Sequence, residues 1–216
     1  MTLSSKFPAE TDLRVAVILL AAGEGSRMGS VPKALLKKNG KSFLECFCTA
    51  ASQLNPVECI IVTGFHASEI ETTFDGFKNF DQLPARIVRN PQPERGQASS
   101  VRIGLEALSN DYDVLIMALC DQPNVSYDEL RELLNQFKLR NANQEIILPA
   151  VNGQRGNPVL FSKKVVSEIL AIPEMVCRPY MDTHTGLIHI FETENKAFIQ
   201  DVDTPDDILT LGITRN

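Results

Sequence analysis

The chain has 216 residues, of which 44% are hydrophobic and 22% are charged, and its formal net charge is −6. This length and this balance suit a single globular α/β domain and exclude a disordered or fibrous chain. The negative charge and the scattered Lys and Arg residues argue against general nucleic-acid binding.

Residues 1–14 are polar and mixed in charge, unlike a secretory signal, and we expect residues 1–13 to form a flexible N-terminal extension. No apolar stretch reaches the length of a membrane span. The five cysteines are odd in number and lie mostly in apolar surroundings, which favours reduced core residues over a disulfide framework. We therefore predict a cytoplasmic protein that does not contact a membrane.

The first predicted strand, Val15–Leu20, is a continuous aliphatic run of the kind buried on both faces of a parallel sheet. Open α/β sheets bind their ligands at the carboxyl ends of such strands. A turn of small residues follows there, made by Ala21, Ala22, Gly23 and Gly25. Its backbone N–H groups can approach phosphate oxygens or a flat base. Arg27 and Lys33 add two positive charges, so the segment favours a polyphosphate ligand.

Two better-known glycine motifs do not fit this segment. A dinucleotide-binding fingerprint would have its last glycine where Met28 stands. A P-loop would have glycine before Lys33 and Ser or Thr after it, whereas the chain has Pro32 and Ala34. The structural alternative is a tight strand-to-helix turn with incidental surface charges.

The rest of the chain alternates predicted strands and helices, as a doubly wound sheet requires. Further strands are predicted at Cys59–Thr63, Ala85–Val88, Val114–Leu119, Glu145–Pro149 and Asn157–Phe161, with edge pieces at Ile188–Phe191 and Ala197–Gln200. Three possible capping boxes predict helix starts: Ser42 with Glu45, Ser68 with Glu71, and Ser126 with Glu129. The fold class is α/β, a single three-layer α/β/α domain over residues 1–216 with a mostly parallel, Rossmann-like sheet.

Two later segments place polar residues beside predicted elements. Gly96 and the serines Ser99 and Ser100 precede a helical pattern, where either hydroxyl could cap the helix. Asp121 follows the strand Val114–Leu119, and a carboxylate at such a strand end suits Mg²⁺. An aspartate before Pro123 could instead initiate a turn.

The C-terminal segment DVDTPDD predicts a helix that Thr204 caps and Pro205 begins. Asp203 lies just before this cap. Between the two acidic segments, RGNPVLF allows a close turn at its glycine, and Arg155 and Asn157 offer polar contacts near the sheet edge.

The segment LAAGEGSRMGSVPKALL resembles the signature of the nucleotidyltransferase superfamily that includes sugar-phosphate, methylerythritol-phosphate and molybdenum-cofactor nucleotidyltransferases. RGQASSVRIGL, CDQP and RGNPVLF then match, in order, segments of the small molybdenum cofactor cytidylyltransferases. The similarity spans nearly the whole chain. It implies a nucleotidyltransferase fold of the GT-A type and transfer of CMP from CTP to molybdenum-loaded molybdopterin, which yields molybdopterin cytosine dinucleotide and pyrophosphate.

The resemblance also implies site residues. Arg27, Lys33 and Asp121 would be catalytic, and Asp121 and Asp203 would bind Mg²⁺. The implied nucleotide-binding residues are Leu20, Ala21, Ala22, Gly23, Gly25, Ser26, Arg27, Lys33, Gly96, Ser100 and Asp121. The implied acceptor-binding residues are Arg155, Gly156, Asn157 and Arg178. The chain departs from the family in this second set, because many relatives have His at the position of Asn157 and a glycine- and aspartate-rich stretch where residues 173–180 read PEMVCRPY.

Several alternatives stay open at this stage. Guanylyl-transferring relatives, which make molybdopterin guanine dinucleotide from GTP, usually have glycine at the position of Ala22, but the alanine pair also occurs in other nucleotidyl enzymes. Some proteins similar to this subgroup are NAD(P)H-dependent pigment reductases. A noncatalytic carrier that delivers its ligand to an apo-molybdoenzyme is a third possibility. An apo-molybdoenzyme of the xanthine dehydrogenase type is also the partner expected to receive the product, and we expect the chain to be a monomer or a weak dimer.

Overall fold

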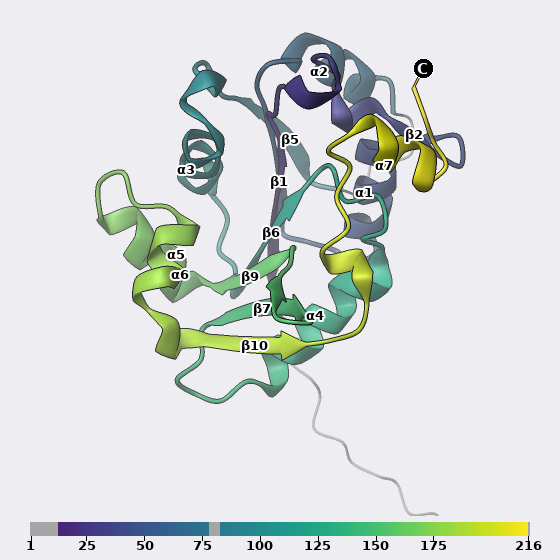
Figure 1. The fold of residues 1–216 in the computed structure, drawn as a ribbon. Helices are drawn as coiled ribbons and strands as arrows, with labels where there is room; N and C mark the ends of the chain where they lie inside the picture. Colours follow the sequence, from purple (N-terminus) through teal and green to yellow (C-terminus); the bar gives the residue numbers. More distant parts are fainter. Residues whose placement is uncertain (1–12, 78–82, 216) are drawn as a thin grey trace, which may run out of the picture.

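The computed structural model describes residues 13–77 and 83–215, and residues 1–12 of the expected N-terminal extension lie outside this range. Its main sheet is built from β1 (Val15–Ala21), β4 (Glu58–Thr63), β5 (Ala85–Arg89), β6 (Val114–Leu119), β7 (Ile146–Val151), β8 (Gln154–Arg155), β9 (Val159–Ser162) and β10 (Ile188–Glu192). The strand order is β10-β7-β9-β6-β1-β4-β5, and β8 pairs with β7 (Figure 1). Strand β1 runs parallel to both β4 and β6, whereas β9 is antiparallel to β6 and β7. The predicted mostly parallel sheet is thus confirmed.

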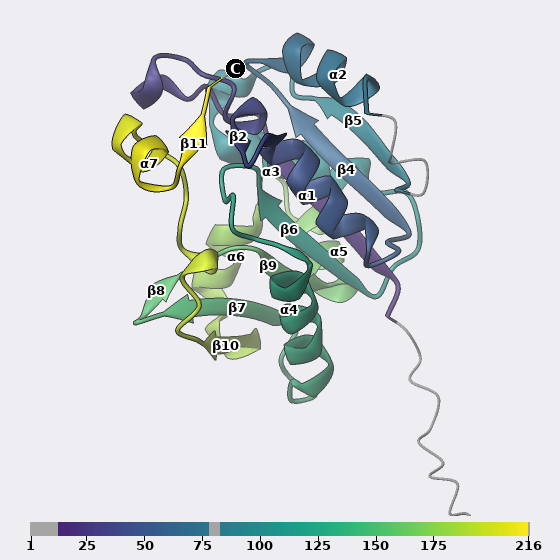
Figure 2. The ribbon, with the colours of Figure 1, turned by 90° about the vertical axis from the view of Figure 1, so that its right-hand side faces the viewer.

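Helices cover both faces of this sheet. They are α1 (Phe43–Ser52), α2 (Ala67–Asp75), α3 (Gln97–Ala107), α4 (Tyr127–Leu139), α5 (Lys163–Ala171), α6 (Cys177–Thr183) and α7 (Pro205–Thr210). Helices α1 and α4 lie on one face, and α3, α5 and α6 lie on the other (Figures 1 and 2). This is the three-layer α/β/α arrangement that the alternation of elements predicts.

Strand β1 is buried on both faces, as its continuous apolar sequence predicts. Val17 and Leu19 belong to the core beneath α1 and α4, while Ala16 and Ile18 belong to the core beneath α3 and α5. All four side chains are fully buried. Burial on both faces holds the strand rigidly, so the turn at its carboxyl end has a fixed base.

A second, small sheet lies beside the first and was not predicted. It joins β11 (Ile213–Thr214), β2 (Lys37–Lys38) and β3 (Lys41–Ser42). A separate apolar cluster beneath it includes Met28, Val202 and Ile208. This cluster packs the C-terminal segment against the loop that follows β1, and so it brings two distant parts of the sequence together.

Two local predictions were wrong. Residues 197–200 do not form a strand, because the Asn195 side chain accepts a hydrogen bond from the Ala197 N–H and starts a short 3-10 helix, Lys196–Phe198. Ser68 does not cap a helix, because α2 begins at Ala67; Glu71 instead binds Arg89.

Other capping predictions were right. Ser126 and Glu129 form a reciprocal capping box at the start of α4. The Ser42 side chain caps α1 by accepting from the Glu45 N–H, so only the serine half of the predicted Ser42 and Glu45 box forms within the described residues. Thr204 caps α7, which begins at Pro205 as predicted.

All five cysteines are free thiols. Within the described residues, the helices are too short or too polar to cross a membrane.

Candidate functional site

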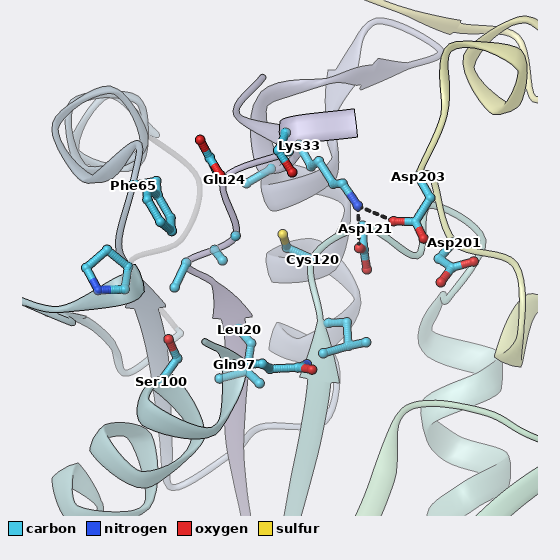
Figure 3. Close-up of a pocket in the computed structure, with 18 of the residues that line it drawn as sticks. Leu20, Glu24, Lys33, Phe65, Gln97, Ser100, Cys120, Asp121, Asp201 and Asp203 are labelled. Atoms are coloured by element: carbon cyan, nitrogen blue, oxygen red, sulfur yellow. Dashed lines mark hydrogen bonds and ion pairs between the residues drawn. The ribbon is translucent and has the colours of Figure 1, made fainter. Parts of the chain in front are cut away.

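A pocket of about 410 Å³ opens at the carboxyl ends of β1 and β6 (Figure 3). This volume lies in the range of small-molecule sites. Every residue predicted to contact the nucleotide or the metal lines it. These residues are Leu20, Ala21, Ala22, Gly23, Gly25, Ser26, Arg27, Lys33, Gly96, Ser100, Asp121 and Asp203. These residues come from distant parts of the sequence, and they meet because the loops after β1 and β6 share one edge of the sheet and the C-terminal segment packs beside them.

The loop after β1 is shaped by glycine and presents free backbone donors. Gly25 has a φ of +68°, and a Cβ there would lie 2.3 Å from the Val31 carbonyl oxygen, so no other residue fits without a shift. The N–H groups of Gly23, Glu24 and Gly25 bond to no backbone acceptor in the described part of the chain. Met28, which is buried, anchors the far end of the loop. Three successive free N–H groups on a fixed loop form a concave site for an anion.

Lys33 lies between two carboxylates at the floor of the pocket. Its Nζ donates to Asp121 Oδ2 at 3.0 Å and to Asp203 Oδ1 at 2.5 Å. Burial alone would lower the pKa of Lys33, but the neighbouring Asp121 and Asp203 outweigh it and raise that pKa. Burial likewise opposes ionisation of Asp203, yet its bonds to Lys33 and Arg27 hold its pKa below the usual value. Arg27 Nη2 lies 2.8 Å from Asp203 Oδ2, so the Asp203 carboxylate pairs with two cations, Arg27 and Lys33.

The C-terminal strap, residues 198–203, is held against the loop after β6 by backbone and side-chain hydrogen bonds. The Val202 N–H donates to the Asp121 carbonyl at 2.9 Å, and the Val202 side chain is fully buried. Gln122 Nε2 donates to the Phe198 carbonyl at 3.0 Å. Asp201 and Asp203 flank Val202, and both line the pocket. Burial, reinforced by Asp121 and Asp203, raises the pKa of Asp201.

The pocket has the donor set of a hard divalent cation. Asp121 Oδ1 is buried and has no hydrogen-bond partner among the described residues, which is costly unless something else binds it. The charged lining residues are two cations, Arg27 and Lys33, and four acids, Glu24, Asp121, Asp201 and Asp203. This excess of negative charge would oppose the binding of a polyphosphate, and a bound cation would offset it. Within residues 13–77 and 83–215, no group of three or more His, Cys, Asp or Glu side chains is placed so that it could hold a metal ion.

Helix α3 approaches the other side of the pocket with its N-terminus. The helix begins at Gln97, and Gly96 is its N-terminal flanking residue, with a φ of +85° and no side-chain cap. Neither Ser99 nor Ser100 caps it, so the capping alternative was wrong. The Asn90 amide donates to Ser99 Oγ at 2.8 Å and to Ser100 Oγ at 2.9 Å. Ser100 is thereby oriented at the pocket wall.

The predicted acceptor-binding residues lie elsewhere, since none of them lines this pocket. Arg155 Nη1 lies 2.6 Å from Asp182 Oδ1, and both side chains are exposed. A Cβ on Gly156 would lie 2.6 Å from the Phe198 carbonyl, and the Asn157 N–H donates to that same oxygen at 2.8 Å. Arg178 is exposed on α6. The predicted acceptor-binding residues therefore lie apart from the predicted nucleotide-binding residues, which line the pocket.

Several lining residues were not predicted. They are Glu24, Ala34, Phe65, Pro93, Gln97, Leu119, Cys120 and Asp201. Asp201 could have been found, because a D-x-D segment places both acids on the same side of a buried middle residue. Phe65 carries no sequence signal, since it lies on a loop whose position depends on tertiary packing.

The chain matches proteins of known family. A model of the MobA-like NTP transferase domain matches residues 17–184. The molybdenum cofactor cytidylyltransferase of Escherichia coli (strain K12) is 30% identical over 193 residues, which are 89% of this chain and 93% of that protein. The nicotine blue oxidoreductase of Paenarthrobacter nicotinovorans is 27% identical over 209 residues, which are 94% of this chain and 98% of that protein.

Solved structures share the fold. Rv0371c from Mycobacterium tuberculosis H37Rv has a TM-score of 0.72 and 25% identity, covering 93% of this chain and 98% of that one. A second structure of Rv0371c, in complex with manganese, has a TM-score of 0.65 and 22% identity, covering 92% and 97%.

Proposed function

The chain belongs to the family of MobA-like NTP transferases, and from this premise we propose that it transfers CMP from CTP to a molybdopterin-type acceptor that carries molybdenum. The observation that carries the proposal is the Lys33, Asp121 and Asp203 cluster beneath a glycine loop with free N–H groups. In the reaction a phosphate oxygen of the acceptor attacks the α-phosphorus of the triphosphate in line. The new P–O bond replaces the bond to the β-phosphate oxygen, and pyrophosphate leaves.

The side chains of this pocket supply positioning and charge. The N–H groups of Gly23, Glu24 and Gly25 would bind phosphate oxygens, and Arg27 and Lys33 would neutralise the charge that grows on the leaving pyrophosphate. Lys33 suits this role because its two carboxylates keep it protonated and hold its Nζ in place. The protein forms no covalent bond to the nucleotide in this scheme.

We propose Mg²⁺ as the cofactor, held by Asp121 and Asp203. The unpartnered Asp121 Oδ1 and the excess of acidic side chains in the pocket fit such an ion. The manganese complex of Rv0371c supports a divalent metal in this fold. When bound, the ion would neutralise phosphate charge and orient the triphosphate.

CTP as the donor is supported by the cytidylyltransferase from Escherichia coli, to which the chain is similar over most of both lengths. Ala22, which lines the pocket, would narrow the space for a purine, although one methyl group discriminates by only about 1–3 kcal/mol. For the acceptor we propose contacts from Arg155 and Arg178. A cytoplasmic location and delivery of the product to an apo-molybdoenzyme belong to the same proposal.

Pyrophosphate release tests the proposal. The protein is incubated with Mg²⁺, molybdenum-loaded molybdopterin and either CTP, GTP, UTP or ATP, and NADPH binding is measured in parallel by thermal shift. Release from CTP alone is expected. Pyrophosphate release from GTP alone would show that the donor is GTP and that the product is a guanine dinucleotide. No release from any triphosphate, with stabilisation by NADPH, would favour a reductase like the nicotine blue oxidoreductase to which the chain is similar.

A further inference from the structure

Phe65 is an exposed aromatic side chain in the wall of the pocket. It follows β4 in the loop before α2, and 43% of its surface is exposed. Figure 3 shows its ring on the opposite side of the pocket from Asp121 and Asp203. Within residues 13–77 and 83–215 no other aromatic ring stacks on it. Leaving a phenyl ring in water is unfavourable, so its place in a pocket points to a ligand that covers it.

The loop that carries Phe65 packs against, and is hydrogen-bonded to, the glycine loop that follows β1. Gly64 is closely packed, because a Cβ there would lie 2.9 Å from both the Ala22 Cβ and the Pro93 Cβ. The Phe65 N–H donates to the Ala22 carbonyl at 3.4 Å. His66 Nε2 lies 2.9 Å from the Glu24 carbonyl oxygen. These contacts fix the position of the ring relative to the glycine loop.

Resting on the proposed function, we propose that Phe65 is a nucleobase-binding residue whose ring packs against the flat face of the base. Ala22 and Pro93, which line the same side of the pocket, complete an apolar wall. The charged groups Lys33 and Asp121 lie across the pocket, where the phosphates would be held. A nucleoside triphosphate has the same division, with a planar base at one end and all of its charge at the other.

The occupant that the contacts favour is the base of the donor and not the heterocycle of the acceptor. The Phe65 loop is bonded to the turn after β1, whereas the predicted acceptor residues 155–157 and 178 lie outside the pocket. Aromatic stacking on a base tolerates different bases, so Phe65 would strengthen binding of every nucleotide, and Ala22 would set the size limit.

The test compares two ligands that share phosphates and differ in the base. Binding of CTP and of inorganic tripolyphosphate, each with Mg²⁺, is measured by titration calorimetry for the wild type, Phe65→Ala and Phe65→Trp. We expect Phe65→Ala to weaken CTP binding about tenfold and to leave tripolyphosphate binding unchanged, and Phe65→Trp to keep CTP affinity. Ile172→Ala is the matched control, because Ile172 is 40% exposed and does not line the pocket.

The outcomes separate the two proposals. Unchanged CTP affinity in Phe65→Ala would overturn the role of Phe65 while leaving the transferase intact. Equal losses for CTP and tripolyphosphate would show a distorted glycine loop and would also overturn it. If Phe65→Ala keeps CTP affinity but raises the acceptor KM, the ring faces the acceptor heterocycle instead. No binding of any nucleotide by the wild type would contradict the proposed function itself.

Discussion

The pocket at the carboxyl ends of β1 and β6 differs from the turn at residues 155–157 in whether its polar groups have hydrogen-bond partners. In the pocket at the carboxyl ends of β1 and β6, the N–H groups of the glycine loop bond to no backbone acceptor and Asp121 Oδ1 has no hydrogen-bond partner in the described part of the chain. At residues 155–157 the Arg155 guanidinium pairs with Asp182, and the Asn157 N–H donates to the Phe198 carbonyl. Unsatisfied groups that the fold holds rigidly indicate a ligand, whereas satisfied groups indicate structure. This difference favours the pocket as the reactive site that we propose, and it indicates that the backbone of the turn at Gly156 has a structural role.

The strongest test of this difference is Asp121→Asn. The amide keeps the shape of the side chain but removes the charge that the proposed Mg²⁺ would bind, so Mg²⁺-dependent turnover should fall by at least about 100-fold. Lys33 retains Asp203 as its partner, so the fold should persist. Steady-state rates and thermal unfolding check this, with Asp206→Asn in α7 as the control. Full activity in Asp121→Asn would remove this carboxylate from the mechanism.

Gly156→Ala tests the structural side of the comparison. The new Cβ would lie 2.6 Å from the Phe198 carbonyl and must displace it. We expect a loss of about 1–3 kcal/mol in the free energy of unfolding, measured with urea. Gly186→Ala is the matched control, because a Cβ there meets open space. Wild-type stability in Gly156→Ala would show that this close contact does not constrain the chain.

Arg155→Ala tests whether the turn at residues 155–157 also binds the acceptor. If the guanidinium contacts an acceptor phosphate, its loss should raise the acceptor KM about tenfold and leave the CTP KM unchanged. Asp182→Ala breaks the same ion pair but keeps the arginine, so its acceptor KM should not rise. Equal acceptor KM values in the wild type and Arg155→Ala would limit Arg155 to an exposed ion pair of about 0–1 kcal/mol.

The smallest expected effect is the pH dependence of stability that comes from the Lys33 and Asp203 pair. The pKa of Asp203 is lowered from 3.8, so its contribution is present above pH 3.8 and is lost as pH falls through the folded value. The pKa of Lys33 is raised from 10.5, so its contribution is present below pH 10.5 and is lost as pH rises through the folded value.

Lys33→Met should therefore lower the free energy of unfolding of the metal-free protein at pH 7 by about 1 kcal/mol, with a smaller difference at pH 3. Urea unfolding in the presence of a chelator measures it. Lys41→Met, at an exposed position in β3, serves as the control. A difference between Lys33→Met and the wild type that stays constant from pH 3 to pH 7 would exclude titration of the pair as its cause.

The sequence predicts the regions where structure is determined locally. The aliphatic run of β1 and the capping signals at Ser126 and Thr204 each identify an element from adjacent residues. The apolar residues 197–199 were mistaken for part of a strand, although Asn195 caps the short 3-10 helix Lys196–Phe198 and Phe198 packs into the core beneath α1 and α4. The small sheet of β2, β3 and β11 could not be predicted either, because its strands are only two residues long and show no sequence pattern.

The pocket likewise contains residues that a local sequence signal identifies and residues that only tertiary packing brings in. Its glycine loop and the acid after β6 stand at strand ends, where a ligand is expected. Phe65 enters the pocket through the packing of Gly64 on Ala22 and Pro93, which no local pattern reveals.

The central claim is that the pocket breaks the bond between the α- and β-phosphates of CTP. The most direct measurement supplies CTP labelled with ³²P at either the α or the γ position, together with Mg²⁺ and the acceptor, and follows both labels. We expect the α label to move to the acceptor and the γ label to appear in pyrophosphate. Release of the γ label as inorganic phosphate, or retention of both labels in CTP, would contradict it.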